Sequence, residues 1–283
     1  MELYTRRTIA QCLDEGWTLM STNFGRILKN LWAPLLLMAT VSGVSAPIWL
    51  NIQRHIVTDA FTLSDILLPV LTLIAMLCAV VIFEAKTFKL LNEQTTRWCI
   101  RRTARFTALM IGIMLILSFA IKMILTILNI SVNKGNINPA IGLALIVAVS
   151  IVLIVMLILV VSPLLYANVK YMIEPETKIR HTWKNYKRGW KSLGKIFAFQ
   201  LLSALIIILV QGIVSLSGII VILAANFSLS GMAFGDPDGL PANFMLIYAI
   251  TVAIASLIYC ALMIWFTLSA YYLYASIEAK YRQ

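Results

Sequence analysis

Few side chains in this sequence are of the types that carry out chemistry, and their spacing assembles no catalytic site. The two histidines, His55 and His181, have no carboxylate, cysteine or second histidine at metal-ligand spacing. The four cysteines form no CxxC pair, and no glycine-rich phosphate loop occurs. We therefore expect a protein that is not an enzyme and that uses neither a cofactor nor a bound metal.

Two acidic residues in an outer loop allow two interpretations. Asp236 and Asp238 precede Gly239 in the segment GDPDG, as the first ligands of a calcium loop would. No bidentate glutamate follows at the required position. Proline presets φ and glycine permits positive φ, so the same segment fits a plain turn, which is the interpretation we favour.

Lys122 is the only charged residue embedded in a long apolar segment, which makes it a candidate for function. Ser118, Thr126 and Asn129 lie on the same helical face, at spacings of four, four and seven residues from it. This face would line a polar cavity if the chain transports a solute. Alternatively, the lysine stem reaches the nearby outer surface and the ammonium group stays hydrated.

The composition indicates that most of this chain is surrounded by lipid. Hydrophobic residues make up 61% and charged residues 12% of 283 residues, whereas soluble domains have about 45–50% and about 25%. A helix needs roughly 20 apolar residues to cross a bilayer. The sequence thus predicts an all-α fold, one integral membrane domain over residues 1–283, with six spans at about 31–50, 66–83, 106–129, 140–168, 196–225 and 244–276.

The orientation of these spans follows from the positions of lysine and arginine. Twenty of the 23 lie in the N-terminal segment, in the connections after the second and fourth spans, and at the C-terminus. Only Arg54 and Lys134 lie in the opposite connections. By the positive-inside rule, both termini face the cytoplasm. We expect a multi-pass protein of a bacterial cytoplasmic (inner) membrane.

The segment KIRHTWKNYKRGWKSLGK, residues 178–195, contains seven lysines and arginines, and no acid. On a helix, Trp183, Tyr186 and Trp190 form one apolar stripe, and the cations occupy the remaining surface. Basic residues interleaved with aromatic rings are also found in nucleic-acid-binding proteins. Because the segment leads directly into a membrane span, we expect an interfacial helix on anionic lipids, and no nucleic-acid partner.

A similar pattern precedes the first span, at a constant offset of 166 residues: Trp17 corresponds to Trp183, Phe24 to Trp190 and Lys29 to Lys195. This indicates an internal repeat of residues 8–84 and 174–278, unless two amphipathic lead-ins converged on one pattern. The residues expected to contact the inner leaflet are Trp17, Phe24, Arg26, Lys29, Trp183, Lys184, Lys187, Arg188, Trp190, Lys191 and Lys195.

Glu84, Glu174 and Glu278 each follow the end of a span that returns to the predicted cytoplasmic side. They either pair with the basic interfacial helices and hold them against the bundle, or are solvated. Exposed ion pairs contribute only about 0–1 kcal/mol, so sequence alone gives the pairing little weight.

Two segments resemble a recurring pattern of membrane domains: YMIEPETKIRHTWKNYKRGWKSLGKIFAFQLL and IAQCLDEGWTLMSTNFGRILKNLW. Each places a short helix with a central tryptophan before a span. The pattern is similar to the six-span membrane domain of some bacterial glycerophosphodiester phosphodiesterases and of related stand-alone bacterial proteins of unassigned function. The catalytic barrel of those enzymes has no counterpart here, so the resemblance implies a membrane module without that activity.

We therefore expect a non-enzymatic subunit, scaffold or lipid-contacting module, with anionic lipids as partners and another membrane protein as a further candidate partner. The alternative is a small-solute or lipid transporter that uses the polar face around Lys122. That alternative is weakened because the spans contain no other ionisable group.

Overall fold

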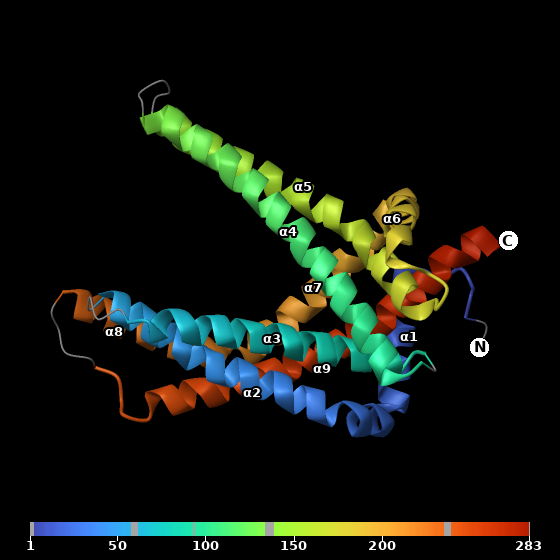
Figure 1. Cartoon of the computed structure of the whole chain (residues 1–283), viewed down its shortest axis with the longest axis horizontal. Helices are drawn as coiled ribbons and strands as arrows, with labels where there is room; N and C mark the ends of the chain where they lie inside the picture. Colours follow the sequence, from blue (N-terminus) through green and yellow to red (C-terminus); the bar gives the residue numbers. More distant parts are fainter. Residues whose placement is uncertain (1–2, 58–61, 93, 134–138, 235–238, 283) are drawn as a thin grey trace. The chain divides into compact units, whose positions relative to one another are not determined.

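The computed structural model describes residues 3–57, 62–92, 94–133, 139–234 and 239–282. Within these residues the chain is helical, with no strand, which confirms the all-α fold (Figure 1). The helices are α1 (Ile9–Thr22), α2 (Phe24–Val57), α3 (Ser64–Lys89), α4 (Thr96–Asn133), α5 (Pro139–Ile173), the 3-10 helix η1 (Ile179–His181), α6 (Thr182–Lys191), α7 (Leu193–Val214), α8 (Leu216–Ala233) and α9 (Phe244–Arg282).

Seven of the described helices are long and apolar enough to cross a membrane: α2, α3, α4, α5, α7, α8 and α9. The chain is thus a helical, multi-pass membrane protein, with one such helix more than the six spans expected from the sequence. The difference arises in the fifth predicted span, 196–225, which the structure extends and divides between α7 and α8.

The division between α7 and α8 is a bend at Ser215. The backbone N–H of Ser215 donates to the Gln211 carbonyl, and the N–H of Ile219 donates to the Ser215 carbonyl, both at 2.8 Å. These bonds keep the i to i−4 pattern of an α-helix on both sides of the bend. The Gln211 side chain donates to Ser215 Oγ at 3.3 Å and to the Ala255 carbonyl at 3.2 Å, which fixes the bend against α9. We therefore treat α7 and α8 as one bent helix.

The described residues divide into two compact units. Unit 1 comprises Met1–Ile9, Arg101–Gln200 and Leu273–Gln283, and unit 2 comprises Ala10–Ile100 and Leu201–Tyr272. Helices α1, α4, α7 and α9 contribute residues to both units, so each unit is built from segments that are distant in the sequence.

In unit 2, α2 packs along α3 and against α8 (Figure 1). The hydroxyl of Ser256 in α9 donates to Ser42 of α2 at 3.1 Å, so small polar side chains meet between these helices. Helix α1 packs on α9, where Trp265 Nε1 donates to the Leu13 carbonyl at 3.3 Å. A Cβ atom on Gly16 would lie 2.8 Å from the Ser269 backbone, so only glycine permits this close approach.

In unit 1, the predicted cytoplasmic halves of α4 and α5 pair through aromatic and charged side chains. The rings of Phe106 and Tyr171 stack at 6.1 Å, and the Arg102 guanidinium lies 4.2 Å from the centre of the Tyr171 ring. Helix α6 packs against α5. The N-terminal segment joins the end of α9, because the Arg7 N–H donates to Ser276 Oγ at 2.8 Å.

The short helices α1 and α6 both precede a long apolar helix, as expected. The helix breaks between them and the following spans occur at Asn23 and Ser192, which are 169 residues apart, three more than the offset of the sequence repeat. The buried residues Leu13, Gly16 and Met20 of α1 also correspond to Thr182, Asn185 and Gly189 of α6 at this larger spacing. The repeat therefore stays a prediction, with a structural register that differs from that of the aromatic stripe.

Candidate functional site

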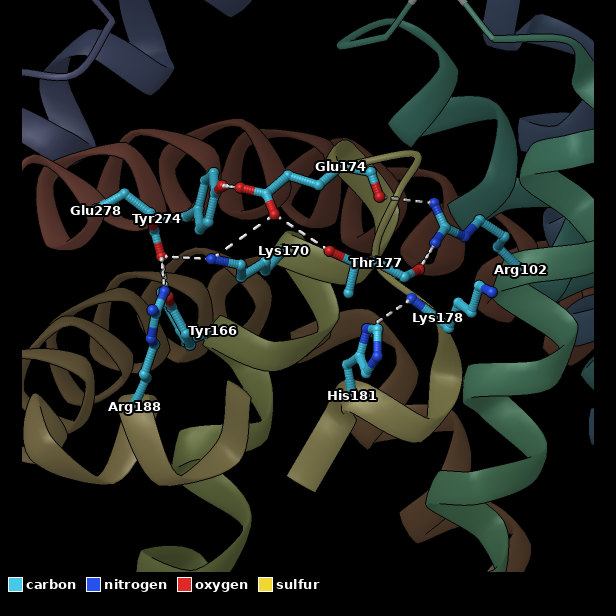
Figure 2. A network of polar contacts seen from close by, with 10 residues as sticks. All are labelled: Arg102, Tyr166, Lys170, Glu174, Thr177, Lys178, His181, Arg188, Tyr274 and Glu278. Atoms are coloured by element: carbon cyan, nitrogen blue, oxygen red, sulfur yellow. Dashed lines mark hydrogen bonds and ion pairs between the residues drawn. The ribbon is translucent and has the colours of Figure 1, made fainter. Parts of the chain in front are cut away.

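A cluster of charged and aromatic side chains lies at the end of α5 in unit 1 (Figure 2). We call it the ionic cluster: Arg102, Tyr166, Lys170, Glu174, Thr177, Arg188, Tyr274 and Glu278. Tyr166 and Lys170 on α5 and Glu174 just after it follow one another at intervals of four residues, and the two members on α9 are also four residues apart. This spacing puts each set on one helix face. The contacts of Tyr166 and Lys170 with Glu278 join the two faces.

Glu278 is the centre of the ionic cluster. It is only 4% exposed, and its carboxylate lies 2.8 Å from Lys170 Nζ, itself a buried residue. The Tyr166 hydroxyl donates to the same oxygen, and Arg188 of α6 lies 3.6 Å from it. A buried carboxylate needs such partners, because an uncompensated charge away from water is very costly.

Glu174 forms the second half of the ionic cluster. Its carboxylate accepts hydrogen bonds from Tyr274 at 2.6 Å and Thr177 at 3.1 Å, and lies 3.7 Å from Lys170. Arg102 of α4 donates to the Glu174 carbonyl at 3.0 Å and also to the Thr177 carbonyl. These bonds fix the connection from α5 to η1 between α4 and α9.

The sequence allows a glutamate at these positions to be paired or solvated, and the structure decides between the two for Glu278. Its contact with Arg188 confirms that this glutamate pairs with the basic helix. Glu174 instead binds α5, Thr177 and α9. Sequence reasoning missed Tyr166, Lys170 and Tyr274, although the four-residue spacing to a glutamate was visible in each helix.

Helix α6 is held on α5 by its small and polar face. Its buried residues are Thr182, Asn185 and Gly189. A Cβ atom on Gly189 would lie 2.7 Å from the Pro163 carbonyl oxygen, so the two backbones are in direct contact. Tyr186 donates to the Val160 carbonyl at 3.1 Å, and burial raises the pKa of this phenol, which keeps it a hydrogen-bond donor.

The opposite side of α6 carries exposed aromatic rings and lysines. Trp183 and Trp190 are 66% and 46% exposed. Their rings lie 5.5 and 6.0 Å from the Tyr186 ring between them. The Trp183 ring stacks on Tyr186 and the Trp190 ring is tilted against it, and we call this row of three rings the aromatic stack. Lys184, Lys187 and Lys191 are exposed around the stack. This surface has the composition of an interfacial helix, with apolar rings beside hydrated ammonium groups.

Two of the cations predicted to contact lipid bind the protein. Arg188 approaches Glu278, and Lys195 Nζ donates to the Arg7 carbonyl and to Ser276 Oγ, both at 2.8 Å. These two residues attach α6 and the start of α7 to the ends of the chain. In unit 2, the other predicted lipid contacts Trp17, Phe24, Arg26 and Lys29 are all exposed.

The predicted polar face around Lys122 lies on α4 alone. Ser118, Lys122, Thr126 and Asn129 line a shallow depression of about 380 Å³ together with Ile121 and Leu125 of the same helix. Lys122 is exposed, and among the described residues no second helix contributes to this depression. The four residues therefore share a face, as predicted, and whether they serve transport stays a prediction.

The two histidines differ in their surroundings. His55 Nδ1 lies 2.7 Å from Asp65, which sequence spacing did not reveal. Asp65 also accepts hydrogen bonds from the Thr62 N–H and hydroxyl, both at 2.7 Å, so it closes the turn before α3. No cluster of three metal-ligating side chains occurs among the described residues. The predicted turn at Asp236 and Asp238 lies outside them.

Comparison of the chain with protein-family models, curated proteins and solved structures gave no match. The ionic cluster offers saturated pairs rather than an open acid, base or nucleophile, so it suits attachment of α6 more than catalysis.

Proposed function

We propose that this protein is a non-enzymatic module of a bacterial cytoplasmic membrane, and that it contacts anionic lipids of the inner leaflet through α6. The observation that carries this proposal is the orientation of α6. Its polar face packs on α5, and Trp183, Trp190 and three lysines are left exposed on either side of the half-buried Tyr186.

Electrostatics support an inner-leaflet position for this surface. Each lysine or arginine close to an anionic membrane surface contributes about 1 kcal/mol to binding. Lys184, Lys187 and Lys191 are exposed, and no acidic residue lies on α6. The exposed tryptophans add interfacial anchoring, because amphipathic rings favour the headgroup region.

Attachment of α6 to the bundle distinguishes this arrangement from a loosely tethered basic segment. Arg188 reaches the buried Glu278, and Gly189 contacts Pro163. A lipid headgroup bound at α6 would thus touch a helix that is packed against α5 and attached to α9 through Arg188 and Glu278. This favours a scaffold or subunit that binds or organises lipid at the surface of α6.

The transporter alternative has weaker support. A transport site at the bilayer midplane is expected between helices or at broken helices. The depression around Lys122 is formed by α4 only, among the described residues. The lipid-contacting proposal is therefore preferred.

Extraction into polymer-bounded native nanodiscs, followed by mass spectrometry of lipids and co-purifying proteins, tests the proposal. We expect anionic phospholipid to be enriched around the wild-type protein over the bulk membrane. Charge reversal at the three exposed residues, Lys184→Glu, Lys187→Glu and Lys191→Glu together, should remove the enrichment, because about 1 kcal/mol of attraction is lost at each position.

The matched control replaces the same three lysines by arginine, which keeps the charge and should keep the enrichment. A stoichiometric protein that co-purifies with wild type would identify the subunit role. Equal lipid composition around wild type, the glutamate variant and the bulk membrane would contradict the proposal.

A further inference from the structure

A groove of about 500 Å³ lies beside α6, and neither the ionic cluster nor the exposed lysines line it. Its volume is within the range of about 300–1,000 Å³ that is usual for small-molecule sites. Helix α4 contributes Leu109 and Ile113, and α5 contributes Val160 and Leu164. Two helices thus supply a continuous apolar wall, which a hydrocarbon chain would cover.

The remaining side of the groove is formed by η1 and α6 and carries two polar groups. Thr182 is only 6% exposed, and its Oγ1 forms no hydrogen bond with any described residue. Buried hydroxyls without a partner are rare in folded proteins. A ligand in the groove would supply the missing acceptor for this hydroxyl.

Arg180 supplies the second polar group of the groove. Its side chain is exposed, and the described part of the chain gives it no acidic partner within ion-pair distance. Trp183 and Tyr186 line the same side of the groove. An arginine in this setting favours a phosphate group, with which it forms strong, charge-assisted hydrogen bonds.

We propose that this groove binds one glycerophospholipid molecule. Its acyl chain lies between Leu109, Ile113 and Leu164, an ester carbonyl accepts the hydrogen bond of Thr182 Oγ1, and the phosphate lies beside Arg180. A soluble phosphate would satisfy the arginine only, and a plain hydrocarbon would leave the buried hydroxyl unpaired. The inference rests on the proposed function, because it requires η1 and α6 to lie in the headgroup layer.

The test is lipid retention by the full-length protein, delipidated in detergent and titrated with phosphatidylglycerol while native mass spectra are recorded. We expect one phospholipid to remain bound at detergent concentrations that strip the others. Thr182→Val removes the hydroxyl at nearly constant shape and should weaken retention roughly 2- to 10-fold, as expected for the loss of one hydrogen bond. Arg180→Gln should weaken it at least as much, because the lost contact is charge-assisted.

Lys184→Gln is the matched control, since this residue is an exposed cation of α6 that does not line the groove. It should retain the lipid as wild type does. Glycerol 3-phosphate, which has the headgroup phosphate without chains, should neither bind detectably nor compete.

Retention that is equal in wild type, Thr182→Val and Arg180→Gln would show annular lipid only and would overturn the inference. Competition by glycerol 3-phosphate would overturn it as well, because the site would then recognise a soluble phosphate. Ile113→Trp, which fills the groove from α4, gives a second check that does not alter α6: the retained lipid should be lost while the thermal transition persists.

The outcomes separate this inference from the proposed function. If reversal of the three lysines fails to change the surrounding lipid but the single lipid is still retained, the function proposal fails and the groove stands. If enrichment depends on the lysines but all groove variants retain lipid equally, the groove proposal fails alone.

Discussion

Replacing Glu278 by alanine should lower the free energy of unfolding in detergent micelles by about 3–5 kcal/mol. The substitution leaves Lys170, which is only 7% exposed, without its 2.8 Å partner. It also removes the acceptor of the Tyr166 hydroxyl and the anion that Arg188 approaches. Breaking one side of a buried ion pair is costly because the remaining charge stays out of water.

The same variant should release α6. Arg188 would lose its anion, so trypsin should cut within residues 184–191 faster than in wild type. Thermal unfolding followed by tryptophan fluorescence gives the stability, and the rate of tryptic cleavage gives the attachment of α6.

Two further variants test whether the loss of stability is specific to the buried ion pair of Glu278. Glu176→Ala removes an exposed glutamate from the connection to η1 and should change neither measurement. A double variant with Glu278→Ala and Lys170→Met should recover part of the lost stability, because the buried lysine, left with only its 3.7 Å contact to Glu174, is then removed as well. If Glu278→Ala and Glu176→Ala unfold alike, the ionic cluster does not hold unit 1 together.

Replacing Gly16 by leucine should detach α1 from α9 in unit 2. A side chain at this position would meet the Ser269 backbone 2.8 Å from its Cβ atom, and a backbone cannot rotate away as a side chain can. Overpacking of this kind costs about 1–3 kcal/mol. A loss of about one to two kcal/mol in the free energy of attachment raises the population of detached α1 roughly 5- to 30-fold.

Cys12 reports the detachment directly, because this residue of α1 is 0% exposed. In a background that lacks the other three cysteines, maleimide labelling of Cys12 should accelerate by the same factor in the Gly16→Leu variant. Gly25→Leu is the matched control, since a Cβ atom there has no neighbour within 4 Å. Equal labelling rates in the two variants would show that α1 does not depend on the close approach at Gly16.

The places of the apolar segments could be predicted because lipid imposes a length and a composition on each span. The aromatic stripe of α6 could be predicted because it repeats with helical spacing. The bend at Ser215 could not, since it is accompanied by a contact between Gln211 and the Ala255 carbonyl of another helix, which one segment of sequence does not reveal. In the sequence, residues 196–225 form a single predicted span.

Only part of the ionic cluster could be identified from the sequence. Glu174 and Glu278 stood out as acids beside basic segments, but Lys170 and Glu278 are 108 residues apart. Their pairing depends on how α5 and α9 pack, which periodicity within one helix does not determine. The buried face of α6 was hidden for a similar reason, because Gly189 gains its role only from the position of Pro163.

The most direct test of the account concerns the side and surroundings of α6. Trp183→Cys, in a background without the four native cysteines, would be reacted with a membrane-impermeant maleimide whose fluorescence depends on polarity. We predict labelling in sealed inverted vesicles and none in intact spheroplasts, with emission typical of the headgroup layer. Labelling from the periplasmic side, or the emission of a fully hydrated dye, would contradict the placement of α6 on the inner leaflet.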